Sequence, residues 1–168
     1  MNKTNEARAR KLVKAGAWFP IVAGFGHALG TIPDLFGRGL FSPTDDEARD
    51  LMTQSPIVLT KALGAGAMSV WEGYLGFNIS HGIGVGFFGF VILLLARRDM
   101  GIFTRIRSLL PLAIGMSLVW FLVSIRYWFY LPTAGAALML GCFTAAFLTL
   151  RRAEGEHSPQ AESPPSRS

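Results

Sequence analysis

The sequence predicts an all-α, polytopic membrane protein: a four-transmembrane-helix bundle with both termini in the cytoplasm and a short amphipathic helix on the outer side. Three observations support this fold class. Of 168 residues, 51% are apolar and 16% are charged, whereas soluble domains carry about 25% charged residues. Four apolar runs reach the length of about 20 residues that a helix needs to cross about 30 Å of hydrocarbon. Most basic residues lie on one side of these runs.

The apolar runs divide the chain into a transmembrane domain, residues 15–150, with a basic segment, 1–14, before it and a polar tail, 151–168, after it. The predicted crossings are residues 15–32, 73–96, 108–125 and 131–150. Continuous apolar runs without alternation indicate helices and not barrel strands. The proline-rich tail has the composition of a disordered segment.

The distribution of basic residues predicts the orientation. Twelve of the 16 basic residues fall in 1–14, 97–107 and 151–168, which share one side if there are four crossings. The opposite loop, 33–72, has three basic and six acidic residues. The positive-inside rule therefore places both termini in the cytoplasm. The net charge of +5 reflects topology, and no contiguous basic surface for a nucleic acid is expected.

The outer segment, 33–72, contains one predicted helix and one ambiguous stretch. Ser42 as N-cap and Pro43 at the first helical position predict an amphipathic helix over 43–52. Residues 56–72 are apolar but interrupted, and fit a re-entrant helix, an interfacial helix or an extension of the second crossing. A fifth crossing there would break the charge asymmetry.

The third and fourth crossings are joined by four aromatic residues, Tyr127-Trp128-Phe129-Tyr130. Such residues are typical of the membrane interface. A link this short predicts that the two helices are antiparallel neighbours.

Several function classes are excluded by what the chain lacks. A single cysteine, Cys142, excludes an intramolecular disulfide framework and a thiolate zinc cluster. No Ser-His-acid arrangement, H-E-x-x-H motif, P-loop or dinucleotide fingerprint is present in the sequence. No catalytic residue can therefore be named, and the protein is more simply interpreted as a non-enzyme.

Polar residues inside the predicted crossings are the functional candidates, because they are costly in hydrocarbon. His27 lies 13 residues beyond Lys14 and His81 lies 16 residues from Arg97, which are depths of about 20 and 24 Å. The two histidines should therefore be neighbours in the outer half, and both are candidate metal ligands. The candidate ligand-binding residues are His27, Thr31, Tyr74, Asn78, His81 and Arg126.

Asn78 lies deeper by the same count, 19 residues from Arg97, or about 28 Å. Thr31, about 26 Å beyond Lys14, matches that depth better than His27 does. We therefore predict Thr31 or a backbone group of the first crossing as the partner of Asn78. Glycines near both histidines permit close helix packing or leave room for a flat ligand.

Three interpretations of this cluster compete. In the first, His27 bonds Asn78, Tyr74 or a backbone carbonyl and only holds the helices together. In the second, His27 and His81 are axial ligands of one haem b, with Arg126 paired to a propionate. In the third, the histidines form a polar pocket with Asp34 and Glu72, open to the outer face, for a small ligand, a proton or a metal.

One segment resembles a known family. The run from Trp71 to Gly84 contains G-F-N-x-S-H-G, Gly26-His27 lies near the end of the first crossing, and Phe41-Ser42-Pro43 lies between them. This pattern resembles small uncharacterised bacterial four-helix integral membrane proteins, and the layout is similar to DoxX-like proteins in helix count and size. The resemblance covers residues 15–98 and implies a bacterial integral membrane protein. It implies no activity, substrate or cofactor.

The sequence thus predicts a multi-pass protein of the bacterial cytoplasmic membrane, a non-enzymatic accessory or small-ligand-binding bundle. The alternatives are a haem b redox protein and a lipid- or quinone-modifying membrane enzyme. Expected partners are the lipid bilayer, a hydrophobic small molecule or haem, and a second copy through the glycine-rich helix faces.

Overall fold

The protein is described from a computed structural model, in which residues 3–37, 39–58, 62 and 68–155 are placed. Its elements, in chain order, are α1 (Lys3–Thr31), the 3₁₀ helix η1 (Ile32–Phe36), α2 (Asp46–Gln54), α4 (Val70–Arg98), α5 (Ile102–Arg105), α6 (Leu109–Arg126) and α7 (Tyr130–Gly155). Among the described residues, α1 with η1, α4, α6 and α7 are long and apolar enough to cross a membrane. The all-helical class is confirmed, and so is the presence of four helices with the length and composition of membrane crossings.

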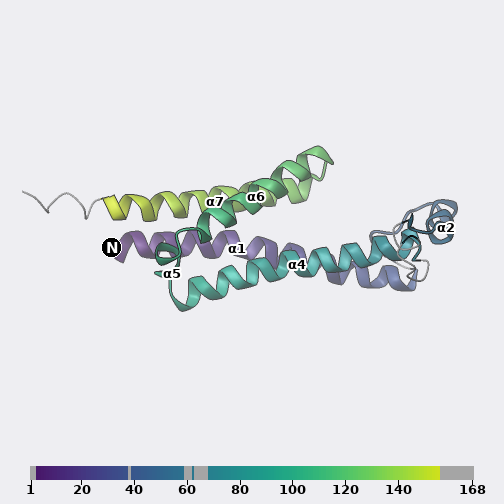
Figure 1. Cartoon of the computed structure of the whole chain (residues 1–168), viewed down its shortest axis with the longest axis horizontal. Coiled ribbons are helices and arrows are strands. Elements are labelled where there is room, and N and C mark those ends of the chain that lie inside the picture. The colour runs from purple at the N-terminus through teal and green to yellow at the C-terminus, as the bar shows by residue number, and fades with distance from the viewer. Residues whose placement is uncertain (1–2, 38, 59–61, 63–67, 156–168) are drawn as a thin grey trace, which may run out of the picture. The chain divides into compact units, whose positions relative to one another are not determined.

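The chain divides into two compact units, which are described separately. The first contains α1 up to Pro20, α4 from Phe88 onward, and α5, α6 and α7. The second, Ile21–Phe87, contains the rest of α1, η1, α2 and the first part of α4. The helices are labelled in Figure 1.

The core of the first unit is built from small and apolar side chains at helical spacing. On α1, Ala9, Val13 and Ala17 recur every four residues and are fully buried. Gly16 lies so close to α7 that an added Cβ would stand 2.9 Å from the Phe143 ring. Buried residues on α7 recur every three or four positions: Ala136, Met139, Phe143, Ala146, Leu150 and Ala153. This periodicity is the one that packs one face of a helix against its neighbours.

The pairing of α6 with α7 follows from their short link, as predicted. Figure 1 shows the two helices side by side. The chain reverses at Trp128, whose φ of 59° lies in the left-handed region, and the Phe129 N–H donates to the Ser124 carbonyl. All four aromatic residues of the link are exposed.

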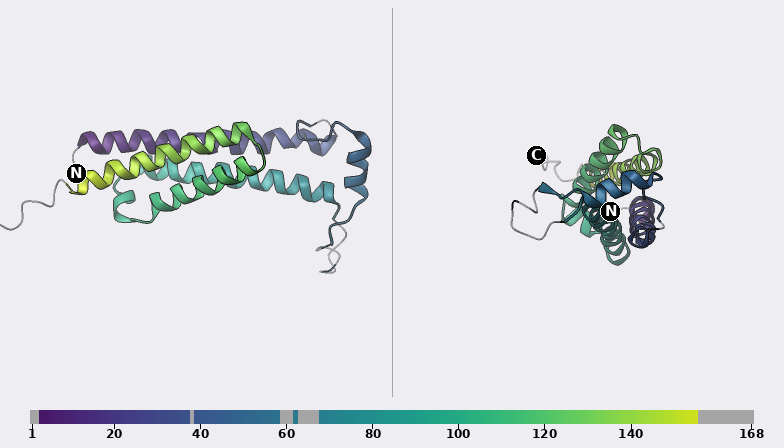
Figure 2. Two further views of the ribbon diagram at one scale, coloured as in Figure 1. Left: turned by 90° about the horizontal axis from the view of Figure 1, so that it is seen from above. Right: turned by 90° about the vertical axis from the view of Figure 1, so that its right-hand side faces the viewer.

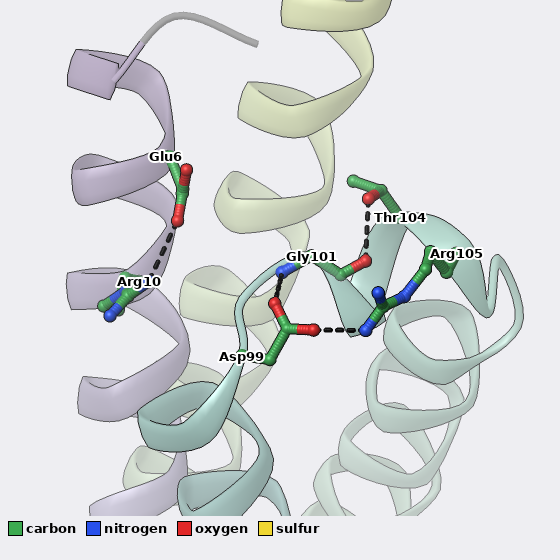
Figure 3. Close-up of polar contacts among 6 residues, drawn as sticks. All are labelled: Glu6, Arg10, Asp99, Gly101, Thr104 and Arg105. Carbon is green, nitrogen blue, oxygen red and sulfur yellow. Dashed lines mark hydrogen bonds and ion pairs between the residues drawn. The ribbon is translucent and has the colours of Figure 1, made fainter.

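The basic segment 1–14 differs from the sequence expectation, because it continues α1 down to Lys3 instead of preceding the helix. Its residues are good helix formers, and Glu6 pairs with Arg10 one turn later at 2.9 Å (Figure 3). Burial of Ala9 and Val13 adds tertiary support.

The turn after α4 is organised by Asp99 (Figure 3). Its carboxylate accepts the Gly101 N–H at 2.8 Å and pairs with Arg105. The Thr104 hydroxyl donates to the Gly101 carbonyl at 2.8 Å. These contacts fold residues 99–105 into a compact corner that leads into α6.

In the second unit, α2 lies across the ends of α1 and α4 (Figures 1 and 2). The predicted start of this helix was wrong. Asp45 is the N-cap and accepts the Glu47 N–H at 3.0 Å, whereas the Ser42 hydroxyl donates to Asp34. The Ser42 hydroxyl instead donates to a buried carboxylate, and a hydrogen bond to a charged acceptor is stronger than one between neutral groups.

The two ends of the ambiguous stretch 56–72 lie side by side, because backbone hydrogen bonds join them. The Ile57 N–H donates to the Met68 carbonyl, the Val70 N–H donates to the Ser55 carbonyl, and Pro56 bridges Ser69. A fifth crossing is contradicted by this pairing, because a crossing would carry its two ends to opposite sides. The extension of the second crossing is confirmed for residues 70–72, which are part of α4. Residues 59–61 and 63–67 lie outside the described part.

The C-terminal ends of α4, α6 and α7 also differ from the predicted bounds. The α4 helix ends at Arg98 and α6 at Arg126, within two residues of expectation. The α7 helix runs on to Gly155, so residues 151–155 are helical and not part of a disordered tail. Burial of Ala153 explains the extension. Residues 156–168 lie outside the described part.

The closest approach in the second unit is a backbone contact between α1 and α4, which we call the glycine crossing (Gly24, Gly82 and Gly86). A Cβ on Gly24 would stand 2.3 Å from the Gly86 nitrogen and 2.6 Å from the Gly82 oxygen. A Cβ on Gly82 would stand 2.7 Å from the Gly24 oxygen. Only glycine permits backbones to touch in this way.

We expect Gly24→Ala to force α1 and α4 apart and to destabilise the protein by about 1–3 kcal/mol, the cost of overpacking a tight contact. The matched control is Gly26→Ala on the same helix, where an added Cβ meets nothing within 4 Å. That variant should be neutral or slightly stabilising, because alanine is the better helix former. Reversible unfolding in detergent measures both, and equal losses would contradict the glycine crossing.

Candidate functional site

The polar cluster of the second unit is built around one side-chain hydrogen bond between α1 and α4. His27 Nε2 lies 2.9 Å from Asn78 Oδ1, so the imidazole nitrogen donates to the amide oxygen. The Asn78 amide nitrogen donates in turn to the Tyr74 carbonyl, one turn back on α4, at 2.9 Å. Both ends of the asparagine are therefore satisfied. Asn78 is buried and His27 is half-buried.

The predicted partner of Asn78 was wrong. The Thr31 hydroxyl is fully buried but donates to the His27 carbonyl on its own helix, at 2.9 Å. The depth count assumed straight, upright helices, and the 2.9 Å distance between His27 Nε2 and Asn78 Oδ1 shows that the two side chains meet despite the difference in counted depth. Of the three interpretations, the first names this His27–Asn78 bond, and the bond is present.

Tyr74 extends the cluster toward the segment after η1. Its hydroxyl donates to the Phe41 carbonyl at 2.9 Å. The Phe41 ring lies against His27, with centroids 4.6 Å apart. Phe41 was not among the predicted site residues, because nothing in a loop's hydropathy shows which side chain will fold back onto a helix.

His81 is the neighbour of His27, as predicted, but its environment differs. The two rings are 6.3 Å apart and nearly perpendicular. Phe77, one turn earlier, stacks on His81 at 5.5 Å and 12°. His81 is exposed on the surface of the unit, and among the described residues no hydrogen bond to its ring nitrogens is found. It thus presents polar atoms outward from an apolar helix.

Asp34 holds the loop that carries Phe41. Its carboxylate is fully buried and accepts the Ser42 hydroxyl and the Phe41 N–H. Gly39 lies directly against it: an added Cβ would overlap the carboxylate oxygens. The arrangement fixes the chain between η1 and α2. Asp34 therefore points into its own loop.

The other two charged candidates, Glu72 and Arg126, make contacts with residues near them in the sequence. Glu72 forms a capping box with Ser69: its carboxylate accepts the Ser69 N–H at 2.8 Å, and the Glu72 N–H donates to the Ser69 hydroxyl at 3.2 Å. The sequence signal for this box, S-x-x-E before an apolar run, was present at 69–72. Arg126 ends α6 in the first unit, with its guanidinium over the Tyr127 ring at 5.5 Å.

Haem b does not fit between α1 and α4 in this arrangement. A haem bound by both histidines would lie between their rings, with one nitrogen of each on the iron. Here His27 Nε2 bonds Asn78, and the helix backbones touch at Gly24, three residues away. A flat macrocycle held by both histidines would have to displace the His27–Asn78 bond. In the described residues, no three His, Cys, Asp or Glu side chains are close enough to hold a metal ion.

We expect His27 and Asn78 to be energetically coupled. A double-mutant cycle of His27→Ala and Asn78→Ala should give a coupling energy of about 0.6–1.7 kcal/mol, the range for hydrogen bonds between membrane helices. The same cycle with His81→Ala in place of His27→Ala should give a value near zero, since no bond joins His81 to Asn78. Unfolding in detergent measures both, and the reverse order would contradict the geometry.

No family model matches the chain, and neither a curated protein nor a solved structure matches it. The resemblance carried by residues 71–84 therefore stays a prediction. The function proposed below follows from the apolar length of the helices and from the geometry of the polar cluster.

Proposed function

We propose that the chain is a multi-pass protein of the bacterial cytoplasmic membrane that binds a small, lipid-soluble molecule and catalyses no reaction. The observation that carries this proposal is the environment of His81: an exposed imidazole on a membrane-length helix, stacked on Phe77 and edge-on to His27. Polar side chains within such helices are costly, and are found mostly where they meet a partner.

The depth of His81 supports a ligand that reaches it from the bilayer. The α4 helix has 29 residues, or about 44 Å, against about 30 Å of hydrocarbon. Counted from Arg97, the hydrocarbon ends near Phe77. His81 then lies roughly one turn below the outer boundary, where a lipid-soluble molecule with a polar head comes to rest.

The surroundings of His81 define the class of ligand. Gly84, one turn further along α4, is exposed, and an added Cβ there meets nothing within 4 Å. A flat ring can lie over this glycine and accept a hydrogen bond from the imidazole. The Asn78 bond restrains His27, which supports the ring of His81 from the side. A ring carbonyl, as in a quinone head group, has the required shape and acceptor.

The cluster supplies binding groups and no reaction centre. Asp34 and Glu72 are engaged in the loop and the helix cap, so no described carboxylate is placed to act as a general base on His81. For this reason we favour a binding function over a lipid- or quinone-modifying enzyme.

We expect the purified protein to bind a short-chain quinone, measured by quenching of tryptophan fluorescence in detergent. His81→Ala should weaken binding about five- to tenfold, the effect of one lost hydrogen bond. Gly84→Leu should abolish binding without loss of thermal stability, because its side chain fills open space. The matched control is Gly115→Leu on α6, also open within 4 Å, which should bind as the unchanged protein does. Equal affinity in all three variants would overturn the proposal.

The orientation is tested separately. With Cys142 replaced by alanine, Gln54→Cys on exposed α2 should react with a membrane-impermeant maleimide in intact cells. Lys11→Cys on exposed α1 should react only after permeabilisation, because the basic ends of the helices face the cytoplasm. The opposite pattern would reverse the topology.

A further inference from the structure

The first unit contains a small hollow at the basic end of its helices, remote in sequence from the polar cluster. It lies between α5, the start of α6 and the end of α7, and its open space is about 20 Å³, enough for about one water molecule or one phosphate oxygen. We call it the basic hollow. Its floor is apolar and buried, and its rim is charged; the residues that matter are Phe103, Leu110, Leu150, Arg107, Arg151 and Glu154.

Two arginines from different helical segments share this rim. Arg107 lies just before α6 and Arg151 lies in the last turns of α7, and both are exposed. The Arg151 guanidinium lies over the Phe147 ring, 5.1 Å from its centroid. Stacking on an aromatic ring restrains a long side chain and leaves the guanidinium edge free to donate. Among the described residues that line the hollow, Glu154 is the one carboxylate beside two arginines, so these residues carry a positive excess.

The other charged residues at this end of the first unit also carry a net positive charge. Among its described residues outside the rim, Glu6 and Asp99 are already paired with Arg10 and Arg105. The remaining basic residues at this end are Lys3, Arg8, Lys11, Lys14, Arg97, Arg98 and Arg152. This end therefore attracts an anion, and the hollow is where two guanidinium groups meet an apolar floor.

We propose that the basic hollow binds the phosphate of an anionic phospholipid. A phosphate oxygen enters the hollow, Arg107 and Arg151 donate to the phosphodiester, and the acyl chains run down the apolar surface of α6 and α7. Basic pockets between transmembrane helices are a recurrent mode of anionic lipid recognition. The position of the hollow, at the residues where two crossings end, places it at headgroup level.

An apolar floor favours a lipid over free phosphate, since free phosphate gains nothing from apolar contact. The two sources share the same phosphate chemistry, and the experiment must separate them. We therefore compare phosphatidylglycerol, phosphatidylcholine with identical acyl chains, and inorganic phosphate.

The experiment is native mass spectrometry of the full chain in a neutral detergent, titrated with each probe. We expect phosphatidylglycerol to bind at low molar excess and phosphatidylcholine to bind more weakly. Arg107→Gln with Arg151→Gln should lower phosphatidylglycerol affinity, by about fivefold for each arginine removed. Arg→Lys at both positions should restore part of the affinity, because charge remains while the paired donors are lost.

The matched control is Arg8→Gln with Arg98→Gln, which removes the same charge from exposed positions at the same end but outside the hollow. This control should retain the affinity of the unchanged protein. Equal loss in both double variants would show attraction by general charge and would overturn the site. Displacement of the lipid by millimolar inorganic phosphate would overturn the lipid as ligand. Circular dichroism checks that every variant stays helical.

Discussion

The polar cluster depends on the backbone contact at the glycine crossing. Gly24, Gly82 and Gly86 allow α1 and α4 to approach until main-chain atoms touch. At that separation the imidazole of His27 reaches the amide of Asn78 at 2.9 Å. In lipid, where apolar side chains gain little from leaving the solvent, close packing and interhelical hydrogen bonds supply the association energy. The glycines and the His27–Asn78 bond therefore stabilise the same interface.

The loop beyond α1 is held by a second set of contacts, which is separate from the glycine crossing. A buried carboxylate, Asp34, collects the Ser42 hydroxyl and the Phe41 N–H, and Gly39 lies flat against it. Phe41 is thereby set against the His27 ring, and its carbonyl receives the Tyr74 hydroxyl. Among the described residues, the side chains of Asp34, Tyr74 and Asn78 and the Nε2 atom of His27 each have a hydrogen-bond partner in this region, whereas no hydrogen bond to the ring nitrogens of His81 is found.

The two ends of the helices differ in chemistry, and this suggests two different kinds of contact with the bilayer. One end carries the aromatic and amide groups around His81 and a mostly acidic loop, and the molecule proposed to bind there is lipid-soluble with a neutral polar head. The other carries a dense set of arginines and lysines, with two of them around a small hollow. Basic charge of this kind is the basis of the predicted orientation and of the proposed phosphate contact.

The sequence by itself determined the helical class, the four helices long and apolar enough to cross a membrane, and the neighbourhood of His27 and His81, because apolar length and residue spacing are local properties of the chain. Tertiary structure decided the rest. Asn78 bonds His27 and not Thr31, because helix approach shifts depths that a straight-helix count treats as fixed. Ser42 donates a hydrogen bond to Asp34 and does not cap α2. The buried carboxylate that accepts this bond cannot be recognised from the local sequence. The exposure of His81 likewise depends on which faces of α1 and α4 meet. Glycines occur on more than one face of α4, so the sequence does not show which face makes the contact.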